Sequence, residues 1–289
     1  MSGGEKSNFK SGNSIFSLPV ILLIAFLFHG TGHAQIFQQI RISSSPNPVG
    51  SGARAQGMGG AFIAVADDAT AASWNPGGLV QLERPEISAV GSIASRIEEY
   101  TSATHPEAET VESTTFADLN YLSAAYPFTL WGRNMVASLN FQRLYDFRKK
   151  LRFNYAYHGE FSDGSTFSVD QAVNYHQSGG LKALAPAYCV QLTPKFSLGL
   201  TLNIWSGKLG WENGWEERYE STAQTDAAGT RIEIGLDRLD RYRNFSGINA
   251  NMGFLWDITP KVTIGGVFKA PFRAHVEHEF TIRNRTFYP

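Results

Sequence analysis

The stretch MVASLNFQRLYDF, Met135 to Phe147, decides the fold class because its side chains alternate between apolar and polar. In an extended chain one face carries Met135, Ala137, Leu139, Phe141, Tyr145 and Phe147, and the other carries Ser138, Asn140, Gln142 and Asp146. Period-two alternation is typical of a β-strand with two unlike faces. The sequence therefore predicts a strand here.

The same alternation recurs in FSLGLTLNIW (196–205), in INANMGFLWDI (248–258) and more weakly in VTIGGVFK (262–269). Two of these strands follow a Thr-Pro-Lys turn, and proline ends strand pairing there. At the other ends the connections are long and polar, and their tips are expected near Asp163-Gly164 and Ala228-Gly229. Short turns opposite long loops are typical of outer-membrane barrels.

The polarity of the two faces separates a membrane barrel from a soluble β-sandwich or barrel, which also alternates. Large aromatic residues lie near the ends of the apolar faces, as in an interfacial girdle, whereas the opposite faces carry Asn, Ser, Thr and Gln. A soluble core would be apolar there. We therefore expect an antiparallel transmembrane β-barrel.

Strand counting predicts seven runs, at roughly 86–98, 116–127, 133–162, 165–192, 195–220, 230–258 and 260–287. Closed single-chain bacterial barrels use an even number of strands, and a free edge is not tolerated in lipid. We therefore expect residues 86–289 to be an incomplete barrel whose C-terminal half is missing.

The N-terminus resembles an export signal. Lys6 and Lys10 precede the apolar run IFSLPVILLIAFLF, and Gly32 and Ala34 are small residues suited to cleavage, which predicts a signal peptide over 1–34. A transmembrane anchor is the alternative, but about 14 apolar residues are short for a span of about 20. The net charge of −1 indicates no basic surface for binding nucleic acid. Cys189 is the single cysteine of the sequence, so no intramolecular disulfide can form.

Between the signal and the strands lies GARAQGMGGAFIAVADDATAASWNPGGL, Gly52 to Leu79, which is too rich in glycine for a helix and does not alternate like a strand. Asp67 and Asp68 are placed to cap a short helix, and Asn75-Pro76 predicts a turn. A nucleotide-binding loop is disfavoured because Phe62 stands where the third glycine belongs. We interpret residues 35–85 as a compact segment that packs tightly against another part of the chain.

This stretch resembles the N-terminal signature of the FadL-type long-chain fatty acid transporter family, which reads Gly-Ala-Arg-Ala, Gly-Gly-Ala, Ala-Asp-Asp-Ala and Asn-Pro-Ala-Gly-Leu. The match covers about 28 residues, and Gly77 replaces the usual alanine after Asn75-Pro76. The resemblance implies a barrel of about fourteen strands, about seven of them here, plugged by an N-terminal hatch. The resemblance also implies that the hatch gates the passage of the ligand. The candidate residues for this hatch and gate are Gly57, Gly59, Gly60, Asp67, Asp68, Asn75, Pro76 and Gly77.

The resemblance favours uptake of hydrophobic compounds such as long-chain fatty acids across the outer membrane, with membrane lipids and a fatty acid-like small molecule as partners. Four apolar residues alternate in step with the polar face of their strands and are therefore candidates to face the lumen: Val136, Leu144, Leu255 and Val267. The alternative for each is ordinary packing against the hatch. The alternative is an outer-membrane component of type IX protein secretion, with WENGWEERYE (211–220) as a contact for secretion proteins or as a loop beside the girdle. We expect no enzyme, metal or cofactor, since the histidines are scattered and no serine lies in an activating motif.

Overall fold

The computed structural model describes residues 47–161, 164–227 and 230–287. The predicted signal peptide, the first residues of the predicted hatch, and Asp163, Ala228 and Gly229 of the predicted tips lie outside these ranges. Within them, no helix is long and apolar enough to cross a membrane.

The chain is all-β and antiparallel, as the alternation predicted. In the described part of the chain eleven strands form one sheet: β1 (Asn47–Pro48), β2 (Glu86–Tyr100), β3 (Thr110–Leu130), β4 (Arg133–Asp146), β5 (Lys149–Glu160), β6 (Thr166–Thr193), β7 (Phe196–Trp205), β8 (Gly214–Ala227), β9 (Thr230–Thr259), β10 (Val262–Lys269) and β11 (His275–Phe287). The helices are short: α2 (Ala53–Gly57), α3 (Ala71–Trp74) and the 3₁₀ turns η1 (Pro76–Gln81) and η2 (Pro106–Ala108).

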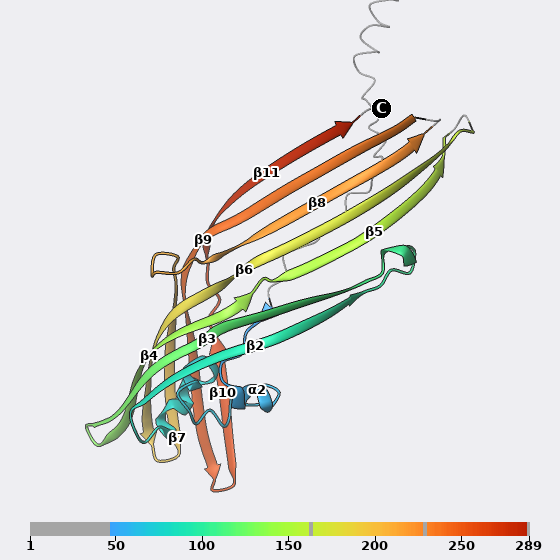
Figure 1. The fold of residues 1–289 in the computed structure, drawn as a ribbon. Coiled ribbons are helices and arrows are strands. Elements are labelled where there is room, and N and C mark those ends of the chain that lie inside the picture. Colours follow the sequence, from blue (N-terminus) through green and yellow to red (C-terminus); the bar gives the residue numbers. More distant parts are fainter. Residues whose placement is uncertain (1–46, 162–163, 228–229, 288–289) are drawn as a thin grey trace, which may run out of the picture. The chain divides into compact units, whose positions relative to one another are not determined.

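The sheet has two parts that share its longest strands. In the lower part the strand order is β10-β9-β7-β6-β4-β3-β2. This part, which we call the wall, is curved like the side of a barrel (Figure 1). In the upper part β8 lies between β6 and β9, while β5 pairs with β6 and β11 with β9. Continuous β6 and β9 thus join the two parts.

Every predicted run contains strand, but three of them are interrupted. Breaks at 147–148, 206–213 and 270–274 separate β4 from β5, β7 from β8 and β10 from β11. Each pair of pieces still lies along one continuous partner, β6 or β9. The interruptions are therefore insertions in a strand path and not reversals of the chain.

The lower sheet has an apolar outward face. Its register aligns Tyr126, Ala137, Tyr188, Leu200 and Met252 across β3, β4, β6, β7 and β9. Ile87 is 88% exposed and Met252 is 54% exposed. We call the following exposed set the apolar face: Ile87, Leu122, Tyr126, Leu139, Tyr188, Leu198, Leu200, Leu202, Ile248, Met252, Trp256, Ile264 and Phe268.

The opposite, inner face is polar and nonetheless buried. It carries Ser123, Ser138, Asn140, Gln142, Ser197, Thr201, Asn203 and Asn251. Asn140 satisfies its amide within the wall: its Oδ1 accepts from Tyr121 and Ser123, and its Nδ2 donates to the carbonyl of Ala185 at 2.6 Å. The polarity of the two faces is thus the reverse of that in a soluble sheet with an apolar core.

Residues 49–85, which we call the N-terminal segment, cover this inner face. Its buried Phe62, Ala66 and Leu79 belong to one core cluster with Val136 and Cys189 of the wall. Figure 1 shows the segment within the curve of the lower strands. The N-terminal segment is therefore packed against the inner face of the sheet.

One assignment of faces was wrong. Phe147 was predicted on the face of Leu139, but it is buried with Leu181, Ala183 and Trp205 on the opposite side of the sheet. The register of β4 against β6 shifts between Arg143 and Tyr145. A bulge of this kind adds a residue and ends the simple alternation.

Candidate functional site

The turn Asn75-Pro76-Gly77-Gly78 is a close contact between the N-terminal segment and the wall. Asn75 is fully buried, and its Nδ2 donates to the carbonyls of Ile63 at 2.8 Å and of Phe254 in β9 at 2.9 Å. Its Oδ1 accepts the N–H of Gly77 at 3.0 Å. One side chain therefore fixes the turn, the preceding loop and the wall together.

Glycine on both sides makes this approach possible. An added Cβ at Gly77 would lie 2.7 Å from the Cα of Phe254. One at Gly199 would overlap the backbone of Pro76, and one at Gly253 would overlap the side-chain Oδ1 of Asn75. Gly199 and Gly253 are paired neighbours on β7 and β9. The turn is thus seated in a notch where the wall has no side chains.

Three wall hydroxyls hold carbonyls of the N-terminal segment. Ser197 donates to Gly77 at 2.7 Å, Thr201 to Ala72 at 2.7 Å and Tyr121 to Ala69 at 2.8 Å. The polar groups of the inner face therefore satisfy backbone carbonyls that packing has removed from water.

The other predicted gate residues lie farther from the wall notch. Gly57 ends α2, and Gly59 and Gly60 have positive φ of 64° and 83° in the turn that follows it. Asp67 pairs with Arg54 at 2.5 Å, and the Oδ1 of Asp68 accepts the N–H of Thr70 at 2.8 Å just before α3. They organise the fold of the segment itself.

The four apolar candidates lie in two places. Val136 is in the core cluster with the N-terminal segment, and Leu255 is buried beside Ser197 and Gly265. Val267 pairs with Gly253, lies on the same face of the sheet as Leu255 and is half-buried. Leu144 lies elsewhere, packed on the cluster that contains Phe147 and Trp205.

A cavity of about 370 Å³ remains between the N-terminal segment and the wall. Gly59, Gly60 and Trp74 line it from the segment, and Arg96 and Asp146 are among its wall residues. Two members of the predicted gate therefore border this cavity, which is open on the side of the exposed Gly59.

A charged cluster borders this cavity. Arg143 is 4% exposed; it pairs with Asp146 at 2.7 Å and also with Asp118. Arg148 contacts Asp118 at 2.6 Å, and Arg96 lies 3.7 Å from Asp146. Three arginines against two aspartates leave one positive charge in excess, and buried charges of this kind are costly unless paired.

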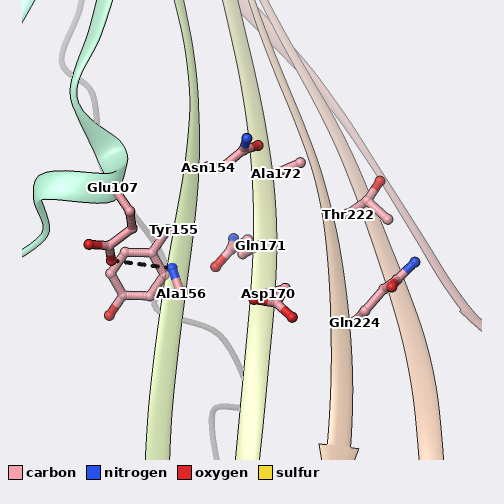
Figure 2. A pocket seen from close by; sticks show the side chains of 9 residues that line it. All are labelled: Glu107, Asn154, Tyr155, Ala156, Asp170, Gln171, Ala172, Thr222 and Gln224. Atoms are coloured by element: carbon pink, nitrogen blue, oxygen red, sulfur yellow. Dashed lines mark hydrogen bonds between the residues drawn. The ribbon is translucent and has the colours of Figure 1, made fainter.

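The upper sheet carries a second polar region. Figure 2 shows a pocket of about 310 Å³ where Glu107, from the β2–β3 connection, lies against Tyr155 and Ala156 of β5. Glu107 accepts the N–H of Ala156 at 3.4 Å, and the ring of His105 lies 4.4 Å from that of Tyr155. These contacts tie the β2–β3 connection to β5.

Two carboxyl groups of the upper sheet have opposite pKa shifts. Burial raises the pKa of Glu217, although a hydrogen bond from Trp215 opposes the shift. Burial also opposes ionisation of Asp240, but hydrogen bonds from Arg238 and His278 outweigh it and lower the pKa of Asp240. Among the described residues no group of three or more His, Cys, Asp or Glu side chains is arranged to hold a metal ion.

Comparison with known proteins assigns no family. No family model matches the chain, and it matches no curated protein and no solved structure. Fold and site geometry therefore carry the functional argument.

The small residues of the wall were not predicted as part of the site. Ala183, Ala185, Ala187 and Cys189 alternate along β6 and are all buried on the inner face. Their spacing of two was the available signal, since a row of small inward side chains leaves room for another segment.

Proposed function

We propose that this protein is an outer-membrane β-barrel that takes up hydrophobic compounds such as long-chain fatty acids, with the N-terminal segment as its hatch. The single observation that supports it best is the arrangement of the faces: the apolar face is exposed, and the polar inner face is covered by the N-terminal segment. An exposed apolar surface of this extent is stable in contact with lipid and unfavourable in water.

The cavity beside Gly59 and Gly60 supports the hatch role. Uptake requires a route past the N-terminal segment, and the cavity lies where the segment meets the wall beside Gly59 and Gly60. Its aromatic and aliphatic lining includes Trp74, Phe116 and Val49, which suits a hydrocarbon chain. The excess positive charge of the neighbouring arginines suits an anionic end group.

The test is saturable binding and uptake of a fluorescent long-chain fatty acid by the full-length protein reconstituted in liposomes. We expect binding to purified protein, and transfer into the liposome lumen above that of protein-free liposomes. If the fatty acid does not bind and secretion proteins co-purify with the protein, the uptake proposal is wrong and the role in protein secretion is favoured.

A further inference from the structure

The insertion 206–213 between β7 and β8 forms a fixed loop on the outward side of the sheet. The ring of Trp211 packs edge-on against Phe141 at 5.0 Å, and Phe141 pairs with Leu122 of the apolar face. Asn213 makes two 2.7 Å hydrogen bonds with the backbone of Lys182, and its carbonyl accepts the N–H of Phe245. The loop is therefore anchored to β6 and β9 and not a free tip.

A polar pocket of about 500 Å³ lies beside this loop. Its charged residues are Glu212 of the loop, Glu216 of β8, and Arg241 and Arg243 of β9. Arg241 donates to Glu216 at 2.9 Å, which neutralises one pair. Within the described ranges Glu212 and Arg243 form no salt bridge, and both are exposed. Lys182 interacts electrostatically with Glu212, and Glu277 lies opposite Arg243 in the pairing of β9 with β11.

The pocket lies at the border of the apolar face. Arg241 and Arg243 belong to the upper part of β9, and Ile248, 65% exposed, is the first residue of the apolar face below them. Asn244, with φ of +55°, lies at the break between the two pairings of β9. Trp211 lies at this border too, and indole rings concentrate where a bilayer meets water.

We propose that this pocket binds a zwitterionic phospholipid headgroup, with the phosphate on Arg243 and the ammonium group on Glu212. The inference rests on the proposed membrane location, because only then does the pocket lie at headgroup height. The cationic Arg241, Arg243 and Lys182 balance the anionic Glu212, Glu216 and Glu277, so a ligand with both charges is matched, whereas a purely anionic ligand leaves a net negative charge.

The experiment is native mass spectrometry of the full-length protein in detergent with phosphatidylethanolamine or phosphatidylglycerol of identical acyl chains. We expect phosphatidylethanolamine to be retained preferentially. Arg243→Gln should weaken its binding about tenfold, the effect of losing one charge-assisted hydrogen bond. Glu212→Gln should abolish the preference between the two lipids, and Arg152→Gln, an exposed outward arginine of β5, is the matched control.

Equal retention of both lipids by the unmodified protein would overturn the headgroup site, as would an Arg152→Gln effect equal to that of Arg243→Gln. Flotation of the protein with liposomes separates this failure from failure of the proposed function. If the protein floats with liposomes but does not select a headgroup, only the headgroup site is refuted and the proposed membrane location stands. If the protein does not float, both the membrane location and the headgroup site are refuted.

Discussion

At Gly199 the wall leaves no room for a side chain, because an added Cβ would overlap the backbone of Pro76. We predict that Gly199→Ala unseats the Asn-Pro-Gly-Gly turn and destabilises its packing by roughly 2 kcal/mol, as overpacking does. Limited trypsin digestion should then cleave faster at Arg54 and Arg84. Gly235→Ala is the matched control, since its Cβ would come no closer than 3.9 Å to Arg285; equal cleavage in the two variants would refute the close seating.

The amide nitrogen of Asn75 donates to two carbonyls, so Asn75→Asp replaces a donor by an acceptor opposite two acceptors. We expect a loss of stability of about 3 kcal/mol, the upper range for a buried polar group left unsatisfied. Thermal melts in detergent measure this, with the exposed Asn154→Asp as control. A melting temperature unchanged by Asn75→Asp would show that the turn does not depend on these hydrogen bonds.

Single residues show where sequence reasoning succeeds and fails. The Asn75-Pro76 turn was predictable because its cause is local. Its partner Phe254 lies 179 residues away, and nothing near Gly199 or Gly253 in the sequence indicates that a backbone will lie against them. Glycine in a strand signals a close approach, but not which segment approaches.

Within β8, the raised pKa of Glu217 predicts a pH-dependent stability. Because the folded-state pKa exceeds the unfolded one, the protonated form favours folding, and this contribution is lost as pH rises through the folded pKa. Glu217→Gln should therefore increase the free energy of unfolding at pH 7 by about 0.5 kcal/mol after allowance for partial exposure, and so raise the melting temperature.

The gain from Glu217→Gln should vanish at pH below the usual range of a glutamate, where the parent protein is protonated as well. The exposed Glu99→Gln on β2 controls for removal of a charge. A gain independent of pH would mean that ionisation of Glu217 is not its cause.

At the level of elements, alternation located all seven runs but not the interruptions within three of them. The sequence is polar or mixed at two of the interruptions, 206–213 and 270–274, and gives no sign of where the strand resumes. Only the pairing shows that β7 and β8 both lie along β6, and β10 and β11 both along β9. The shift near Arg143 was likewise invisible, so Phe147 was assigned to the wrong face.

For the whole molecule, the polarity of the faces was predictable because parity alone assigns Leu198, Leu200 and Leu202 to one side and Ser197, Thr201 and Asn203 to the other. The structure agrees: the leucines are exposed and the polar residues buried. The covering of the polar face by the N-terminal segment could be expected only from the resemblance of its sequence, because packing between distant segments leaves no periodic trace.

Cysteine scanning along residues 197–203, in a Cys189→Ala background with the protein in liposomes, is the most direct test that the apolar face of β7 contacts lipid. Each cysteine carries a fluorophore and is exposed to a quencher confined to the acyl chains. We predict quenching at Leu198, Leu200 and Leu202 and little at Ser197, Thr201 and Asn203. Fluorophores at the three leucines that escape this quencher but are quenched by a water-soluble one would contradict it.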